Sequence, residues 1–426
     1  MLDIKLVREN PDIIRKDLKK RNDPEKLKIL EDLIKEDKKW RASLFRLEEL
    51  RKHRNRITSD IAKMKKENKS FQLKIQEMKI ISKEIPKLGE ETNTSRENVR
   101  SALMRLPNIL DKSVPIGKDE TENVVIKKFG KPPKLADPKN HQEIAERIGI
   151  LDMERAAKVA GNGFFYLKGG LALLERAIQS FAIDFLVKKN YVLVVPPYML
   201  NRKAYEGVTE LEAFDNVLYK IEGEDLHMIA TAEHPMASMY MNEVIDVEDL
   251  PIKFIGISPC FRKEIGSHGK YTKGLFRVHN FNKIEQFVFC HPDKSWDFLK
   301  ELQENAETLY QKLGLVYRVV NVCTGDIGIL AAKKFDTEIW MADKEYREIG
   351  SNSNCTDYQA RRLNIKFREG EGKPPAGFVH TLNNTALATS RTMVAILEQY
   401  QQKDGSVKIP RVLIPYMGGI KKLEPK

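Results

Sequence analysis

The sequence predicts an α+β protein in two parts: an N-terminal antiparallel helical hairpin and a mainly antiparallel sheet flanked by helices. Between residues 25 and 106, apolar side chains recur at alternating three- and four-residue steps, the period of a coiled coil. The stretch from Pro259 to Phe289 contains two aromatic and β-branched segments joined by SHGKYTKG, which predicts a β-hairpin. Beyond residue 130, strand-like runs alternate with helical ones, as in α+β domains.

Charge is unevenly distributed along the 426 residues. Residues 1–110 hold 29 Lys/Arg against 19 Asp/Glu, which accounts for +10 of the net charge of +12. The chain has no apolar run of eighteen residues, and MLDIKLVREN lacks the apolar segment of a signal peptide, so we expect a cytoplasmic protein without membrane attachment. The four cysteines are widely separated and predict neither a zinc site nor a disulfide framework.

The first 110 residues are expected to form the helical arm. Residues 1–22 predict a short amphipathic helix, and two long apolar seams follow on either side of a turn at residues 67–70. Pro86 lies within the second seam and predicts a kink or local break, because proline lacks an amide donor. Residues 41–69 carry ten Lys/Arg against four acids. That surface is equally typical of a solvated coiled coil and of a contact with a phosphate backbone.

Composition also predicts the domain boundaries. Residues 111–130, rich in proline, glycine and acidic residues, are expected to be a linker between domains at 1–110 and 131–426. In the second domain we expect three long helices, at residues 170–189, 292–312 and 385–402. Strands are expected at residues 191–195, 254–257, 287–289, 317–322 and 337–340.

The predicted hairpin concentrates charge on one face. Side chains alternate between the two faces of a strand, so Arg262 and Glu264 point the same way. The returning strand would add Arg277, His279, Phe281, Lys283 and Glu285. A solvated sheet face is the commoner explanation of such a pattern. However, the opposite positions are apolar and predict an ordered array, which suits a phosphate, a carboxylate and a flat ring bound together.

Seven stretches, taken in order, resemble a known family. They are YVLVVPPYM, TAEHP, the hairpin at 259–289, CTGDIG, REIGSNSNCTDYQARRLNIKF, HTLNNTALATSR and DGSVKIPRVLIPY. In number and order they are similar to the seryl-tRNA synthetases of class II, especially the archaeal ones, over nearly the whole chain. The resemblance implies a class II synthetase core, a tRNA-binding arm and a homodimer formed through residues 170–197. It also implies that L-serine and ATP give seryl-adenylate, and that the seryl group then passes to the 3′-terminal adenosine of tRNA(Ser), with tRNA(Sec) as a further acceptor.

The resemblance implies a role for individual residues in ATP binding. Arg262 and Arg391 would be the catalytic residues, at the α- and γ-phosphates, and Glu264 and Phe281 would contact the adenine amino group and ring. The full ATP-binding set would be Arg262, Lys263, Glu264, Arg277, Val278, Phe281, Glu348, Ile349, Gly350, Ser351 and Arg391. Within it, Glu348 and Ser351 would bind Mg²⁺ through hard oxygen donors.

The same resemblance implies the serine and tRNA sites. The serine-binding set would be Thr231, Ala232, Glu233, Arg262, Glu285, Asn383 and Thr385. On the arm, tRNA would contact Arg46, Arg51, Arg54 and Arg56. Lys270 and Lys273, in the hairpin loop, are equally consistent with contacts to the tRNA acceptor end and with a solvated loop.

Four positions, in three places, depart from the bacterial pattern of the family. Gly350 stands where those members have serine, Asn384-Thr385 where they have Gly-Ser, and Ser390 where they have glycine. The charged positions are retained, so the departures concern the shape of the serine pocket. Two alternatives stay open: a paralogue that activates another small amino acid or serves another acceptor, and a non-catalytic tRNA-binding paralogue.

Overall fold

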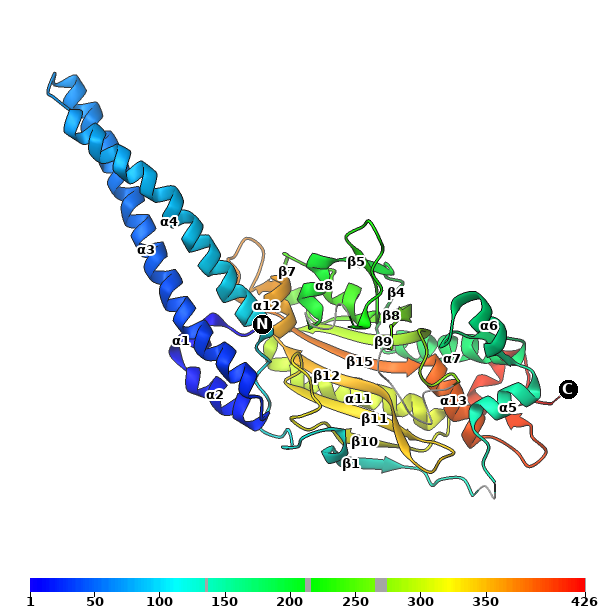
Figure 1. Ribbon diagram of the computed structural model, residues 1–426. Helices are drawn as coiled ribbons and strands as arrows, with labels where there is room; N and C mark the ends of the chain where they lie inside the picture. Colours follow the sequence, from blue (N-terminus) through cyan, green and yellow to red (C-terminus); the bar gives the residue numbers. More distant parts are fainter. Residues whose placement is uncertain (135–136, 211–215, 265–273, 426) are drawn as a thin grey trace. The chain divides into compact units, whose positions relative to one another are not determined.

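The chain consists of two compact units, Met1–Pro107 and Asn108–Lys426 (Figure 1). The computed structural model describes residues 1–134, 137–210, 216–264 and 274–425. Lys270 and Lys273 therefore lie outside the described residues.

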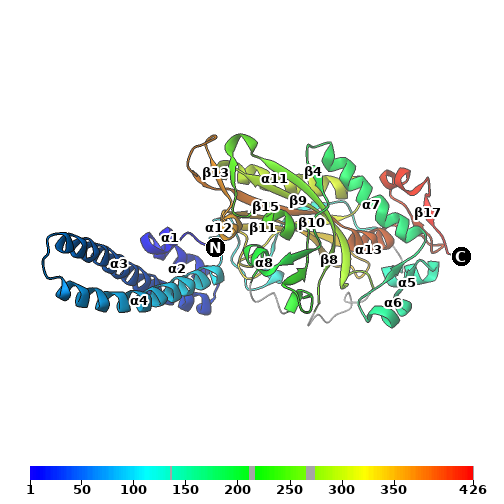
Figure 2. The same cartoon turned by 90° about the horizontal axis from the view of Figure 1, so that it is seen from above.

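The N-terminal unit is helical. Its helices are α1 (Ile4–Glu9), α2 (Pro11–Lys20), α3 (Pro24–Lys66) and α4 (Gln72–Arg105). Helices α3 and α4 lie side by side as an antiparallel hairpin (Figures 1 and 2), and at ~1.5 Å per residue the 43 residues of α3 span roughly 65 Å. Leu33, Leu47, Ile57, Ile81 and Val99 are among the apolar side chains buried along the two helices. The predicted helical arm is confirmed.

Two details of this unit differ from expectation. Pro86 does not interrupt α4. It cannot donate a hydrogen bond to the carbonyl of Ser82, but both residues are exposed, so water can hydrate that carbonyl. The single helix expected at residues 1–22 is divided in two, because α1 is capped at Asn10 and Pro11 begins α2.

The C-terminal unit is built on an eight-stranded sheet. From one edge to the other, its strands are β1 (Val124–Phe129), β10 (Tyr317–Asn321), β11 (Lys333–Trp340), β12 (Tyr346–Thr356), β15 (His380–Ala388), β9 (Asn280–Cys290), β8 (Ile252–Phe261) and β4 (Val192–Val194). Neighbouring strands are antiparallel except β4 and β8, which are parallel. The predicted mainly antiparallel sheet is confirmed.

In the described part of this unit, helices and four small sheets surround the large sheet. The α-helices are α5 (His141–Ile148), α6 (Met153–Ala160), α7 (Gly170–Val187), α8 (Arg202–Val208), α10 (Glu233–Ser238), α11 (Ser295–Lys312), α12 (Tyr358–Leu363) and α13 (Thr389–Gln399). The small sheets pair β2 (Leu151–Asp152) with β3 (Tyr166–Leu167), β5 (Met199–Asn201) with β6 (Leu226–Met228), β16 (Val407–Lys408) with β17 (Lys422–Leu423), and β13 (Lys366–Arg368) with both β7 (Val244–Asp246) and β14 (Gly377–Phe378).

Helix α11 covers one face of the large sheet (Figure 2). Gln286 of β9 and Asn352 of β12 point toward it and donate hydrogen bonds to the carbonyls of Leu302 and Leu299, at 3.2 and 2.8 Å. Because side chains alternate along a strand, the neighbours Glu285 and Ser351 point to the opposite face. That face carries the site described below.

Three boundaries differ from those expected. The segment expected to be a linker contains β1, whose backbone pairs with β10. Its apolar, β-branched run Val124-Val125-Ile126 is short, has exposed side chains and follows the polar, acidic stretch that predicted a linker. Residues 385–388 belong to β15, and α13 begins only at Thr389. The returning strand of the hairpin begins at Asn280, because Arg262 and His279 lie just beyond the paired strands, where the Arg262 amide donates to the His279 carbonyl at 2.9 Å.

None of the helices in the described residues is both long enough and apolar enough to cross a membrane.

Candidate active site

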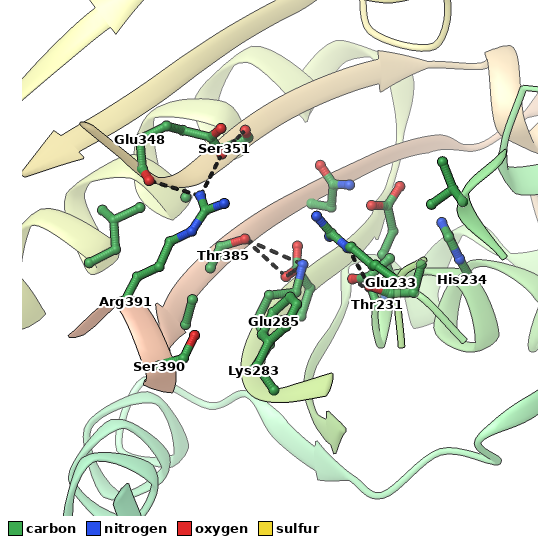
Figure 3. Close-up of a pocket in the computed structure, with 18 of the residues that line it drawn as sticks. Thr231, Glu233, His234, Lys283, Glu285, Glu348, Ser351, Thr385, Ser390 and Arg391 are labelled. Carbon is green, nitrogen blue, oxygen red and sulfur yellow. Dashed lines mark hydrogen bonds and ion pairs between the residues drawn. The ribbon is translucent and has the colours of Figure 1, made fainter. Parts of the chain in front are cut away.

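A cavity of about 440 Å³ opens on the face of the sheet opposite α11 (Figure 3). Its volume lies within the range of small-ligand pockets, roughly 300–1,000 Å³. The residues assigned to a ligand from the sequence that line it are Thr231, Glu233, Arg262, Glu264, Arg277, Val278, Phe281, Glu285, Glu348, Ile349, Gly350, Ser351, Asn383, Thr385 and Arg391.

Two predicted ligand-binding residues do not line the cavity. Ala232 is fully buried against β8, where a Cβ at Gly256 would lie 2.6 Å from the Ala232 Cβ. Lys263 uses its backbone amide to bond the Val217 carbonyl at 3.0 Å. The arm residues Arg46, Arg51, Arg54 and Arg56 lie in α3, all with exposed side chains, and Arg46 pairs with Glu84.

One end of the cavity is organised by Glu285. Lys283, two residues earlier on β9, places its Nζ 2.6 Å from Glu285 Oε2. Thr385 of β15 donates its hydroxyl to the same oxygen at 3.2 Å. All three residues are buried, so the ion pair is shielded from solvent and fixes the direction of the carboxylate.

Glu233 lies beside this cluster, at the start of α10 (Figure 3). Gln359 donates to Glu233 Oε1 at 3.0 Å and in turn accepts from the Thr381 hydroxyl at 2.7 Å. Burial, together with the negative charge of Glu285, raises the pKa of Glu233 to about 7. A cationic ligand would stabilise the charged form of this carboxyl group and lower its pKa, so Glu233 favours binding of a cation.

Arg262 and Phe281 lie at the ends of β8 and β9. The Nε of Arg262 donates to the Ala230 carbonyl at 3.2 Å, and its guanidinium carbon lies 5.3 Å from the centre of the Phe281 ring. Arg277 pairs with Glu264 at 3.0 Å. These contacts orient two guanidinium groups toward one cavity, and guanidinium groups match the geometry of phosphate and carboxylate oxygens.

A third arginine, Arg391 in the first turn of α13, lies at the opposite end (Figure 3). Its Nη1 donates to the Glu348 carbonyl at 2.8 Å, and its guanidinium carbon lies 4.8 Å from the centre of the Phe276 ring. Burial lowers the pKa of Arg391. Burial opposes ionisation of Glu348, but the positive charges of Arg391 and Lys334 outweigh it and hold the pKa of that carboxyl below its ordinary value.

Glu348 and Ser351 form a small oxygen cluster on β12. The Ser351 hydroxyl donates to Glu348 Oε1 at 3.4 Å. Behind them, Asp336 of β11 pairs with Lys334 at 3.4 Å, and burial raises the pKa of Asp336 to about 7. No group of three or more His, Cys, Asp and Glu side chains is arranged to hold a metal ion within the described ranges.

The departure at Gly350 has a steric explanation. A Cβ at this position would lie 2.8 Å from the Thr385 Cβ and 3.1 Å from its methyl group. The absence of a side chain at Gly350 therefore leaves space for the methyl group that Thr385 has and the serine of bacterial members lacks. Asn384, next to Thr385, points to the other face, where its Oδ1 accepts from Gln286 at 2.7 Å.

Some lining residues had been given no role from the sequence. Lys283 belongs to the predicted charged face, where strand alternation places it beside Glu285, and Ser390 is one of the departures from the bacterial pattern, but neither had been assigned to a ligand. His234 adjoins Glu233, and burial lowers its pKa to about 3. Lys334 carried no local signal, because it reaches the cavity only through the pairing of β11 with β12.

The antiparallel sheet and its arginine-lined cavity define a class II aminoacyl-tRNA synthetase core. The family model "tRNA synthetase class II core domain (G, H, P, S and T)" matches residues 218–400, and "Seryl-tRNA synthetase N-terminal domain" matches residues 1–110. The chain belongs to the seryl-tRNA synthetase family, as the sequence resemblance predicted.

Individual relatives cover the whole chain. A serine–tRNA ligase of Methanocella arvoryzae is 55% identical over 425 residues, 99% of this chain and 100% of its own. The crystal structure of seryl-tRNA synthetase from Pyrococcus horikoshii complexed with ATP has a TM-score of 0.95 at 46% identity and covers 100% of both chains. The cytoplasmic serine–tRNA ligase of Naegleria fowleri in complex with AMP has a TM-score of 0.88 at 38% identity, covering 100% of this chain and 99% of its own.

Proposed function

We propose that the chain is a serine–tRNA ligase that joins L-serine to ATP, releasing pyrophosphate, and then transfers the seryl group to the 3′-terminal adenosine of tRNA(Ser). The observation that carries this proposal is the arrangement of charge in one cavity. Carboxylates and hydroxyls lie at the Glu233–Glu285 end, and three arginines face the remainder. An amino acid held by its ammonium and hydroxyl at the first end would direct its carboxylate toward Arg262.

The arginines account for adenylate formation without a protein nucleophile. The serine carboxylate attacks the α-phosphate of ATP in line, and pyrophosphate leaves. Arg262 would neutralise both the attacking carboxylate and the α-phosphate, while Arg277 and Arg391 would hold the rest of the triphosphate. Phe281 would stack on the adenine ring, and Glu264 would accept from its amino group. Glu264 would have to exchange part of its contact with Arg277 for that hydrogen bond.

The serine pocket would select for a hydroxyl. Glu233 would bind the ammonium, and Glu285 would accept a hydrogen bond from the serine hydroxyl. Thr385 would donate to that hydroxyl in exchange for its bond to Glu285. Thr231 and Asn383 would complete the pocket. An amino acid without the hydroxyl would not form these hydrogen bonds, and a site built to bind a hydroxyl can reject such an analogue by up to about 10⁴–10⁵ in kcat/KM.

Glu348 and Ser351 fit a divalent cation such as Mg²⁺. Both supply hard oxygen donors, the charges of Arg391 and Lys334 favour the ionised form of Glu348, and the two oxygens lie close enough to share one ion. A bound Mg²⁺ would neutralise charge on the ATP phosphates. The two residues would hold the ion, and Arg391 would contact the triphosphate.

We also propose that residues 1–110 form a tRNA-binding domain and that residues 131–426, together with β1 from the segment expected to be a linker, form a catalytic domain in a cytoplasmic homodimer. The arginines near the arm tip, Arg46, Arg51, Arg54 and Arg56, would contact the tRNA backbone. The expected dimer segment exposes apolar side chains, including Val192 and Val195 at 59% and 66%. Among the described strands, β4 is at one end of the large sheet, so its outer edge could pair with a partner.

Pyrophosphate exchange with serine, threonine, alanine and glycine tests the function. We expect exchange with serine and ATP and a very low rate with alanine and glycine. Preference for another amino acid would favour the paralogue with a different substrate. Absence of exchange with all four would favour the non-catalytic tRNA-binding paralogue.

A further inference from the structure

A buried pair outside the cavity, His141 and Glu398, has no role in the reaction described above. His141 begins α5 and is 3% exposed, and Glu398 lies near the end of α13 and is 1% exposed. Glu398 Oε1 accepts from the His141 amide at 3.0 Å and lies 2.8 Å from its Nδ1. The other oxygen, Oε2, accepts from the Ala342 amide at 2.7 Å.

The far side of the imidazole holds the backbone next to the active site. The amide of Leu275 donates to His141 Nε2 at 3.2 Å. Since an amide can only donate, Nε2 is unprotonated there, and the ring proton is on Nδ1, where it is donated to Glu398. Gly274 has φ +68°, and a Cβ there would lie 2.2 Å from Nε2, so glycine provides the space for this contact.

Leu275 is followed directly by Phe276, which contacts Arg391, and by Arg277, and both arginines are proposed to bind ATP. The Phe276 carbonyl accepts from Arg391 Nε at 3.4 Å, and its ring lies against the Arg391 guanidinium. Arg277 itself lines the cavity. Helix α13 therefore holds this strip of backbone twice, directly through Arg391 and, two turns later, through Glu398 and the His141 ring.

We propose that His141, oriented by Glu398, is a positioning residue for ATP: it sets the backbone at Leu275 and thereby the placement of Phe276, Arg277 and Arg391 against the triphosphate. The inference rests on the proposed function, since it assigns these arginines to ATP. Serine binding should be almost independent of it, because the serine pocket is built around the carboxylates of Glu233 and Glu285 at the other end of the cavity.

Comparing His141→Asn with His141→Gln distinguishes loss of the hydrogen bond to Leu275 from a general loss of folding stability. The asparagine amide can replace Nδ1 as donor to Glu398, but it does not reach the position of Nε2. Glutamine is longer and can offer its Oε1 to the Leu275 amide. His380, half-buried with its Nδ1 2.9 Å from Ser295 Oγ and outside the cavity, supplies the matched control His380→Gln.

Pyrophosphate exchange gives KM for ATP and serine, and calorimetry gives the ATP Kd without serine. For His141→Asn we expect KM and Kd for ATP to rise about tenfold, with the serine KM changed less than about twofold, because a small misplacement of binding groups weakens only their own ligand. His141→Gln should recover most of the loss. Glu398→Gln, a second variant that keeps the imidazole, should shift ATP binding about threefold in the same direction.

Three results would overturn the proposal. The ATP Kd could be unchanged in His141→Asn and Glu398→Gln, binding of ATP and of serine could weaken equally, or His141→Gln could be as impaired as His141→Asn. If the wild-type chain failed to activate serine, the proposed function would fall, while the ATP Kd values would still decide the role of His141.

Discussion

Each charged residue of the cavity is oriented by a hydrogen bond or ion pair with a neighbouring residue. A bound ligand would have to leave that contact in place or replace it. Glu285 is held by Lys283 and Thr385, and Glu233 by Gln359. This preorganisation lets the site present fixed charges to serine and ATP without reorganising at the moment of reaction. It also makes single substitutions informative, because each removes one defined interaction.

Arg262→Ala is expected to lower kcat/KM for serine-dependent pyrophosphate exchange by about 10²–10³, since one donor to the developing charge is removed. Exchange kinetics measure this effect. Binding of tRNA to the arm should remain measurable by filter binding. Arg202→Ala, which removes an exposed arginine paired with Glu206, is the control and should leave exchange unchanged. Normal activation by Arg262→Ala would contradict the assignment.

Glu233→Gln tests the raised pKa of that carboxyl. The folded protein holds the proton to about pH 7, whereas an unfolded carboxyl releases it near 4.5, so the stability of the wild type falls as pH rises from about 4.5 through about 7. The glutamine variant does not show this fall. Its melting temperature relative to wild type should therefore be higher at pH 8 than at pH 5, by calorimetry.

The same carboxyl predicts a pH dependence of serine use. Below pH 7 Glu233 is largely protonated in the free enzyme and binds an ammonium poorly, so kcat/KM for serine should rise through pH 7. The variant should be much less active and lack this rise. In the melting experiment, a difference between Glu233→Gln and wild type that does not change with pH would show that the Glu233 pKa is not raised.

At the scale of elements, the arm can be removed at its base. Glu25 of α3 and Arg105 of α4 pair at 3.2 Å, so the two ends of the hairpin meet there. Replacing residues 25–105 by a short glycine-serine linker should leave serine-dependent exchange near the wild-type rate. Aminoacylation of tRNA should fall by more than about 100-fold, because ion pairs with phosphates supply much of the affinity.

Charge substitutions on α3 provide the finer version of this experiment. Arg51→Gln, Arg54→Gln and Arg56→Gln combined should weaken tRNA binding and reduce the slope of log K against log salt by about 0.7–0.9 for each phosphate that an arginine no longer neutralises. Loss of exchange in a folded arm deletion, or an unchanged salt slope in the triple variant, would contradict the modular assignment.

At the scale of the whole molecule, the exposed apolar segment around β4 predicts self-association. Val192→Asp with Val195→Asp should convert the proposed homodimer to a monomer, because both side chains would otherwise be buried against a second copy. Light scattering after size-exclusion chromatography measures the mass. Leu73→Asp, at an 81% exposed position on α4, is the matched control and should remain dimeric. A wild-type monomer would refute the dimer directly.

The sequence by itself determined the family, the helical arm and the antiparallel core, because these depend on periodicity and on contiguous motifs. It did not place β1, because the short apolar run Val124-Val125-Ile126 follows a polar, acidic stretch typical of a linker. It also did not place the start of α13, because Thr385 to Ala388 are held in β15 by strand pairing rather than by local propensity. Helix continuity through Pro86 depended on which carbonyl faces solvent.

Only the tertiary structure decided which residues meet. Strand alternation indicated the charged face of the hairpin. Three other features depend on segments far apart in the chain: the position of Lys334 at the cavity, the steric fit of Gly350 with Thr385, and the hydrogen bonds from Glu398 through His141 to Leu275. Such contacts arise from strand register and helix packing, which no local pattern of one sequence encodes.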